Sequence, residues 1–184
     1  FDHPLASGER ISVYPAFRTL PSPAGGLPVD PARLRFVLDV NLGKLARWLR
    51  LLGFDALYRN DFDDAEVATL SAAQARIALT RDRRLLHQKQ IVHGYWVRAE
   101  DPDRQILELI RRYRLRPHVR PFHRCTSCNG LIRPVPKCDV LPLLEPKTRR
   151  YYHTFFQCTA CGKVYWKGSH YEGILRKIDQ ALQG

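Results

Sequence analysis

Two acidic side chains of this chain stand just past the ends of short, mainly apolar stretches. Asp39 follows the run 36–38, and Asp82 follows the run 76–80. Carboxylates at such positions are oxygen ligands of the kind that hard divalent cations prefer, although an acid after a strand is also an ordinary turn or cap residue. If both runs are parallel strands of one sheet, their carboxyl ends meet at one edge, and the two acids converge there.

Four more carboxylates are crowded into residues 61–66. Asp63 or Asp64 can cap the helix that follows, which we expect to run to about residue 74. Clustered carboxylates repel one another unless a cation lies between them. An acidic helix start stabilised by the helix dipole explains each of them equally well when it is taken singly.

Four of the five cysteines form two CxxC pairs, Cys125 with Cys128 and Cys158 with Cys161. Two such turns together supply the four thiolates of a tetrahedral zinc site, and a site with four protein ligands is structural because it has no open position. Paired CxxC turns and an odd cysteine count favour metal in a reducing compartment over a disulfide framework. Cys138 is left over, and we expect a packed or free thiol there, with a metal-ligand role as the alternative.

The charge of the chain indicates a polyanionic partner. The net charge is +12 and the isoelectric point is about 9.9, which favours nucleic acid. Six arginines lie within residues 111–124, a stretch that reads either as a phosphate-binding hinge or as a solvated linker. No apolar run approaches the roughly 20 residues of a membrane span, so we expect no membrane association and a cytoplasmic location.

The elements that must position these groups alternate along residues 35–115. We expect strands at 36–38, 54–58, 76–80 and 91–97, and helices that start near Asn41, at 63 or 64, at 83 and at 101 or 103. Asn41 is the expected cap of the first helix, and Gly53 is its expected stop. Alternating strands and helices predict an α/β fold with a parallel sheet. On the first helix we expect a basic, exposed face made of Lys44, Arg47 and Arg50.

The segment around the cysteines predicts a small β-rich module. We expect strands at 130–135, 152–156 and 163–166, which make a zinc ribbon, and a closing helix marked by Ile174, Ile178 and Leu182. Residues 166–171 mix aromatic, cationic and hydroxyl side chains that can stack on bases and bind phosphates. The same aromatic rings can instead serve as the core of so small a ribbon.

Together these motifs resemble the RNase domain family first noticed at the C-terminus of the mutator exonuclease Mut-seven, a branch of the PIN-like nucleases with an appended zinc ribbon. The resemblance covers about residues 34–175, and five stretches carry it: FVLDVNLGKLARWLRLLGFDA, DDAEV, IALTRDRRLL, the paired CxxC turns and VYWKGSHY. Residues 9–15 also resemble the last strand of a ubiquitin-like β-grasp domain that precedes the RNase domain in some members.

The resemblance implies a PIN-like parallel sheet flanked by helices, followed by a small four-cysteine zinc ribbon. We therefore expect a β-grasp remnant at 1–20, a linker at 21–33, a nuclease domain at 34–117, and the ribbon with the closing helix at 118–184. PIN-like nucleases carry a ring of carboxylates that binds magnesium or manganese. By motif position that ring would be Asp39, Asp64 and Asp82, with Asp101 as a weaker fourth catalytic candidate and Asp63 as the alternative to its neighbour Asp64.

The expected function is a metal-dependent endoribonuclease whose ribbon helps to hold RNA, single-stranded or structured, with tRNA and ribosomal RNA as candidates. Two other readings stay open: a non-catalytic RNA- or ribosome-binding protein, and a toxin-like nuclease controlled by a protein partner. The residues expected to bind RNA are basic or aromatic: Lys44, Arg47, Arg50, Arg81, Arg83, Arg111, Arg112, Arg114, Trp166, Lys167 and His170.

Overall fold

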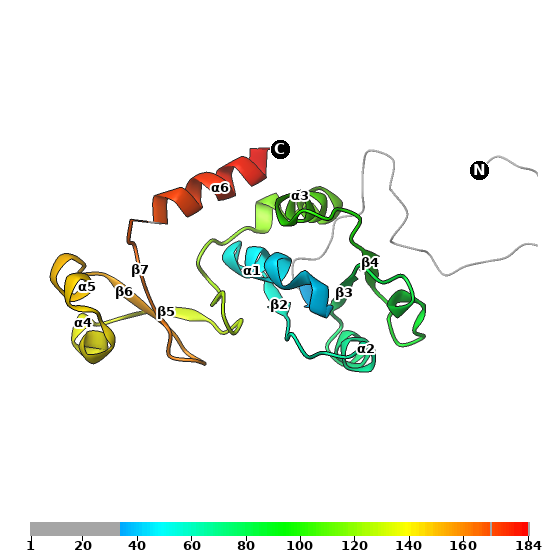
Figure 1. Cartoon of the computed structure of the whole chain (residues 1–184), viewed down its shortest axis with the longest axis horizontal. Coiled ribbons are helices and arrows are strands. Elements are labelled where there is room, and N and C mark those ends of the chain that lie inside the picture. Colours follow the sequence, from blue (N-terminus) through cyan, green and yellow to red (C-terminus); the bar gives the residue numbers. More distant parts are fainter. Residues whose placement is uncertain (1–33, 170, 184) are drawn as a thin grey trace, which may run out of the picture.

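The structure of the protein is a computed structural model that describes residues 34–169 and 171–183. The expected β-grasp remnant and linker at 1–33, and also His170, lie outside the described residues. Figure 1 shows an α/β part, a smaller ribbon part beside it, and a C-terminal helix that runs from the ribbon back over the α/β part.

Four parallel strands form the sheet of the α/β part, as predicted. They are β1 (Arg35–Leu38), β2 (Asp55–Leu57), β3 (Ile77–Thr80) and β4 (Gly94–Trp96), in the order β2-β1-β3-β4. Every neighbouring pair is parallel. The chain leaves β1 toward β2 and then returns past β1 to form β3, so the strand order reverses between β1 and β3. Ligands of open α/β sheets bind at such a switch point, outside the carboxyl ends of the strands.

Helices cover both faces of this sheet. Helices α1 (Gly43–Leu51), α3 (Pro102–Tyr113) and α6 (Tyr171–Gln183) share the larger apolar core with the sheet, whereas α2 (Asp64–Ala73) packs over the other face with a smaller core. In Figure 1, α1 and α3 lie above the strands and α2 lies below them. Strands buried on both faces read as apolar runs, which is why 36–38 and 76–80 were recognisable in the sequence.

The first helix begins differently from the prediction. A short 3-10 helix, η2 (Val40–Leu42), precedes α1, and its cap is Asp39, whose side chain accepts a hydrogen bond from Val40 N. The prediction that Asn41 caps the helix is therefore wrong, because the carboxylate that ends β1 already satisfies the first free amide. Gly53 follows the end of α1 with φ +93°, and a Cβ there would lie 2.1 Å from Arg120 O. Only glycine fits that close approach.

Two other helix starts are defined by acids. Asp63 caps α2 in a capping box, in which its side chain accepts from Glu66 N and the Glu66 side chain accepts from Asp63 N. Asp101 caps α3 by accepting from two backbone amides of the first turn. The helix expected at 83–88 is only a 3-10 turn, η3 (Leu85–His87), and another, η4 (Arg116–His118), follows α3.

The ribbon is a three-stranded antiparallel sheet. Its strands are β5 (Ile132–Val135), β6 (Phe155–Cys158) and β7 (Val164–Trp166), in that order. The sequence reading missed three short helices between β5 and β6, namely α4 (Lys137–Val140), η5 (Leu141–Leu143) and α5 (Pro146–Tyr151). Their apolar residues Val140 and Leu144 pack with Phe155 to form a separate small core.

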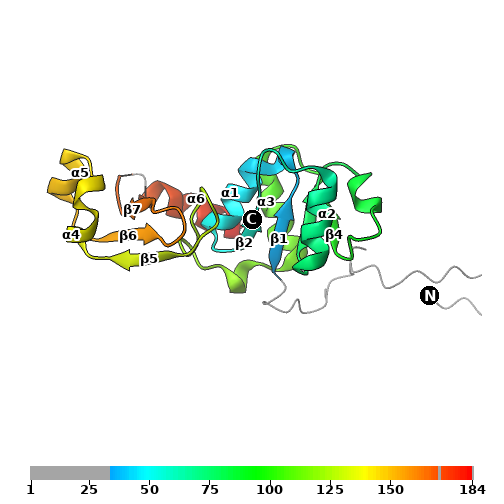
Figure 2. The ribbon, with the colours of Figure 1, turned by 90° about the horizontal axis from the view of Figure 1, so that it is seen from below.

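The C-terminal helix packs with the α/β part rather than with the ribbon. Ile178 and Ala181 of α6 are buried in the core shared by α1 and α3, and Figure 2 shows α6 beside α1 and α3. The expected boundary after residue 117 stays a prediction, but the chain on both sides of the ribbon contributes to one core. No helix within the described residues is long and apolar enough to cross a membrane.

Candidate functional site

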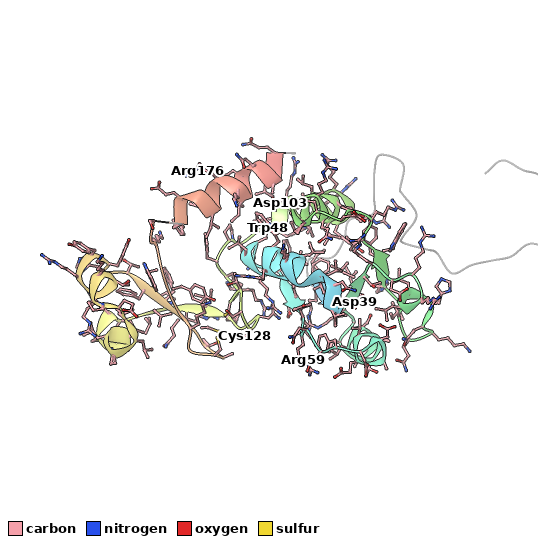
Figure 3. The ribbon with its side chains drawn as sticks, viewed as in Figure 1. Asp39, Trp48, Arg59, Asp103, Cys128 and Arg176 are labelled. Carbon is pink, nitrogen blue, oxygen red and sulfur yellow. The ribbon has the colours of Figure 1, made fainter. Side chains whose placement is uncertain are left out.

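The carboxylate of Asp39 is held between the two strands at which the strand order reverses. Its Oδ2 accepts a hydrogen bond from Thr80 Oγ1 at 2.8 Å, and its backbone amide donates to Leu79 O at 3.0 Å. Asp39 is 5% exposed and Thr80 is fully buried. The end of β3 therefore orients the acid that follows β1, and Figure 3 labels the position of Asp39.

Thr80 also positions the turn that carries Asp82. Its hydroxyl accepts from Asp82 N at 2.8 Å, while Asp82 Oδ1 accepts from Arg84 N at 2.8 Å. One hydroxyl thus links the Asp39 carboxylate to the backbone of Asp82. The sequence reading passed over Thr80, although a threonine two residues before an acid at a strand end is a signal for such a turn.

The four acids of residues 61–66 differ in the partners that their side chains have in the structure. Asp61 pairs with Arg59 at 2.9 Å, and Glu66 pairs with the same arginine at 3.1 Å and completes the capping box with Asp63. Asp64 is the first residue of α2 and has no hydrogen-bond or ion-pair partner within the described part of the chain. Of these acids, Asp64 is the one that intramolecular contacts leave available.

Asp64 interacts with the other two candidate acids. Asp64 is an exposed residue, but partial desolvation raises the pKa of its carboxyl, and the negative charges of Asp39, Asp82 and Asp63 raise it further. The start of α2 therefore faces the carboxyl ends of β1 and β3. Among the described residues, however, these acids are not as tightly grouped as the cysteines described below. The donor set is all oxygen and fits magnesium or manganese, which usually keep several water ligands and bind through one or two carboxylates.

Asp101 is not drawn into this group. Its side chain accepts from Asp103 N and Arg104 N at the start of α3. Its charge is not among the causes of the raised pKa of Asp64. The structure gives this fourth candidate a capping role at the same edge of the sheet.

Four of the expected phosphate contacts lie near the carboxyl edge. Lys44 and Arg47 are exposed on the first two turns of α1, which starts at that edge. Arg81 and Arg83 follow β3. Arg81 pairs with Glu100 at 2.9 Å, and the Arg83 guanidinium lies 3.8 Å from the centre of the Trp96 ring.

The expectation that Arg50 lies on the exposed face of α1 is wrong. Arg50 is 3% exposed, and its guanidinium donates to the carbonyl oxygens of Ala56, Ser127 and Thr126 at 2.9, 2.9 and 3.3 Å. Its partners belong to β2 and to the first CxxC turn. Arg50 therefore joins the ribbon to the α/β part, and its buried guanidinium is not available to RNA.

Arg111, Arg112 and Arg114 lie at the other end of the sheet. Helix α3 starts after the carboxyl end of β4 and runs back along the sheet, and these arginines are at its C-terminus. Twelve helical residues span about 18 Å. The Arg112 guanidinium lies 5.7 Å from the centre of the Tyr95 ring. The structure therefore does not bring these arginines to the carboxylates.

The four cysteines of the two CxxC turns come together. Their sulfur atoms all lie within 4.8 Å of one another, with 3.7 Å between Cys125 and Cys161 and 3.4 Å between Cys128 and Cys158. Four thiolates around zinc at about 2.3 Å require neighbouring sulfurs about 3.8 Å apart, so the arrangement can hold a zinc ion. All five cysteines are free thiols, and Cys138 lies outside the cluster.

The electrostatics of the cluster agree with a cation site. Burial opposes ionisation of Cys125, but hydrogen bonds from Tyr165 and from backbone amides lower its pKa to about 6. Burial and the neighbouring thiols raise the pKa of Cys128 to about 12. Without a cation the four sulfurs cannot all ionise, and a divalent metal replaces the protons they share.

Of the three ribbon residues that we expected to bind RNA, the structure describes Trp166 and Lys167. Trp166 is on β7 and is 38% exposed, and Lys167 follows it with its Nζ 5.4 Å from the centre of the Tyr171 ring. His170 lies outside the described residues. Figure 3 places Cys128 where the ribbon meets the α/β part, away from Asp39.

A family model described as Mut7-C RNAse domain matches residues 34–178 of this chain. The matched range contains the candidate carboxylates, both CxxC turns and most of α6. No curated protein and no solved structure matches the chain.

Proposed function

This chain belongs to the Mut7-C RNAse domain family, and from that premise we propose that it is a metal-dependent endoribonuclease. The family indicates a nuclease-like role, and the proposal adds the reaction, the place and the metal. RNA phosphodiesters would be hydrolysed at the carboxyl edge of the sheet, where β1 and β3 end.

One observation carries the proposal. The acids beside Asp64 are paired or serve as caps, yet its own carboxylate has no hydrogen-bond or ion-pair partner among the described residues, and the negative charges of Asp39 and Asp82 raise its pKa. Unpaired like charges that gather at one place destabilise a fold unless a cation joins them. Their position at the switch point of the sheet is where a ligand is expected.

The residues of the chain would divide the work as follows. Asp39, Asp64 and Asp82 would hold magnesium or manganese, which when bound supplies charge stabilisation for phosphodiester hydrolysis. Thr80 would fix the orientation of Asp39 and the turn of Asp82. Lys44, Arg47, Arg81 and Arg83 would pair with phosphates of the strand and fix its position.

The ribbon would contain a structural zinc held by Cys125, Cys128, Cys158 and Cys161. Four protein ligands leave no open coordination position, so this metal would stabilise the ribbon and take no part in cleavage. Free thiols throughout the described part of the chain suit a reducing compartment, and we propose a cytoplasmic location.

The decisive experiment is cleavage of RNA by purified protein, with manganese added or omitted and with zinc content measured throughout. We expect manganese-dependent cleavage by the wild type and none by Asp39→Asn. Asp101→Asn is the matched control, because it removes one negative charge at the same edge while asparagine remains a good helix cap. Equal cleavage by the wild type and Asp39→Asn would exclude this catalytic site, and RNA binding without cleavage by the wild type would favour the non-catalytic alternative.

A further inference from the structure

A large cavity lies between the ribbon and the segments that connect it to the α/β part. Its volume is about 860 Å³, within the range of sites that bind small molecules or nucleotides. Helix α5, strands β6 and β7, the segment after η4 and the start of α6 contribute its walls. Seven of its twenty lining residues are aromatic, among them Tyr151, Tyr152, Tyr165, Trp166 and Tyr171.

Two of these rings are more exposed than a folding role would require. Trp166 is 38% exposed and Tyr151 is 64% exposed, whereas Phe155, which serves the ribbon core, is 2% exposed. The Trp166 ring lies 6.3 Å from that of Tyr152. It also lies against Gly168, where an added Cβ would be 2.9 Å from Trp166 Nε1. The ring is thus supported on one side without being buried.

The charged residues of the lining are all positive. Lys147, Lys163 and Lys167 line the cavity together with Arg124, and no acidic residue does so among the described residues. The Arg124 guanidinium is already engaged by Asn129 O and Asp55, so the three lysines supply the cations that face the cavity. A cavity with cationic and aromatic walls and no acid complements an anion with flat rings.

We infer that this cavity is a base-stacking site for single-stranded RNA. Aromatic platforms beside cations are how proteins bind single strands without reading a duplex, because every base has a face that can stack. Bases in a duplex are already stacked on one another and are therefore unavailable. The inference rests on the proposed function for RNA as the ligand, and it adds the form of that RNA and the place where its bases bind.

The site is separate from the carboxylate edge. In Figure 1 the ribbon lies on one side of α1 and the start of α2 lies on the other. A single strand that reaches both places must cross α1, where Lys44 and Arg47 are exposed. The cavity therefore anchors the strand at a distance from the bond that is cut.

The test compares two RNAs that carry the same phosphates. A labelled oligouridine of about 12 nucleotides and an abasic strand of equal length are titrated by fluorescence anisotropy. The protein carries Asp39→Asn so that neither strand is cut. Trp166→Ala should weaken oligouridine binding roughly 5- to 150-fold, the range for loss of one base–aromatic stack, and should leave binding of the abasic strand unchanged.

Three further variants make the result decisive. Trp166→Phe keeps a stacking ring and should bind within a few-fold of the parent. Tyr151→Ala removes a ring that is 64% exposed, so it leaves the fold intact and should also weaken binding of oligouridine alone. Leu143→Ala removes an exposed ribbon side chain outside the cavity and should change neither affinity. Zinc content is measured for each variant.

The inference is overturned if Trp166→Ala and Tyr151→Ala leave oligouridine binding unchanged, or if they weaken binding of both strands equally. Failure of the nuclease proposal gives a different result. Base-dependent binding that is lost with Trp166, in a wild-type protein that cuts no RNA, supports the cavity and rejects catalysis. If the wild type cuts RNA and the cavity variants bind oligouridine as well as the parent does, the nuclease proposal is supported and the cavity proposal is rejected.

Discussion

At the scale of single residues, the candidate site depends on which acids are already engaged within the protein. Asp63 and Asp64 are adjacent and chemically identical, yet one closes a capping box and the other has no partner within the described part of the chain. Asp39, Asp82 and Asp101 all accept hydrogen bonds, but only the charges of Asp39 and Asp82 act on the carboxyl of Asp64. Capping needs only an oxygen acceptor, which asparagine also supplies, whereas a cation needs negative charge.

The first prediction uses this difference between neighbours. Asp64→Asn should reduce manganese-dependent cleavage by about a hundredfold or more, since even residues that merely orient metal ligands are worth 10- to 100-fold. Asp63→Asn should keep the cap and most of the activity. Initial rates of cleavage of one labelled RNA at saturating manganese measure both. A larger loss in Asp63→Asn than in Asp64→Asn would show that the cation uses the other acid.

The second prediction concerns pH. In the ion-free protein, partial desolvation and the charges of Asp39 and Asp82 raise the pKa of Asp64. The Asp64 carboxyl therefore binds its proton more tightly in the folded protein than in the unfolded chain, where the pKa of an aspartate is about 3.9. The protonated Asp64 carboxyl therefore favours folding at pH values below the unfolded pKa. This stabilisation is lost as the pH rises through the pKa of Asp64 in the folded protein.

Asp64→Asn should then raise the Tm of the ion-free protein at neutral pH, and the gain should shrink toward about pH 4. Thermal unfolding followed by circular dichroism measures the difference. Added manganese should stabilise the wild type by mass action, by about 2.7 kcal/mol at a hundred times its Kd, and should stabilise the variant less. A gain in Tm that does not change with pH would mean that Asp64 carries no such charge interaction.

At the scale of elements, the ribbon is fastened to the α/β part through polar groups. Arg50 reaches from α1 to the first CxxC turn, and Asn129 Oδ1 accepts from Ala56 N at 3.0 Å on the edge strand β2. Asp55 on β2 pairs with Arg76 at 2.7 Å and with Arg124 at 3.3 Å. Burial opposes ionisation of Asp55, but hydrogen bonds from Arg76 and Asn129 hold its pKa below the usual range. These contacts cover an edge that would otherwise be open to pairing with another strand.

The third prediction tests this junction. Arg50→Gln should lower the free energy of unfolding by roughly 3 kcal/mol or more, because bonds from a charged donor are worth about 1.5–3 kcal/mol and their buried acceptors would lose their partners. Arg47→Gln, one turn earlier and exposed, should change it by less than about 0.5 kcal/mol. Urea unfolding compares them. Equal stability of the two variants would mean that the carbonyl contacts of Arg50 contribute nothing.

At the scale of the whole molecule, the two parts share their stability. The ribbon supplies Asn129 to β2, and α6 returns from the ribbon to the core around α1 and α3. Structural zinc contributes roughly 10–16 kcal/mol of apparent binding free energy in small fingers. Loss of that metal would therefore destabilise the edge strand of the parallel sheet as well as the ribbon.

The fourth prediction follows from this coupling. Cys128→Ser should lose zinc, unfold the ribbon and speed hydrogen exchange at the Ala56 amide, while amides of the central strand β1 stay protected. Cys138→Ser, at an exposed thiol outside the cluster, is the matched control and should change neither. Hydrogen exchange followed by mass spectrometry measures the protection of these amides, and elemental analysis measures the zinc content. Full zinc content in Cys128→Ser would remove this cysteine from the metal site.

The sequence alone determined the elements and the metal-binding turns. Strands buried on both faces, helix caps and CxxC turns are local patterns, so the parallel strands, the three main helices of the α/β part and the four-cysteine cluster were predictable from neighbouring residues. The short helices α4 and α5 were missed because pieces of four and six residues carry too little periodicity to be recognised.

Only the tertiary structure decided which polar groups are engaged and where the charges lie. Arg50 is one helical turn after buried Ala46, so its spacing allowed burial, but arginine is rarely buried without partners and these come from distant segments. The sequence assigned Arg111, Arg112 and Arg114 to RNA without indicating their position, and the direction of α3 places them at the edge of the sheet opposite the acids. Thr80, Asp64 and the ribbon cavity likewise depend on residues far apart in the chain, because hydrogen bonds and cavity walls are made by contacts in space, which sequence spacing does not record.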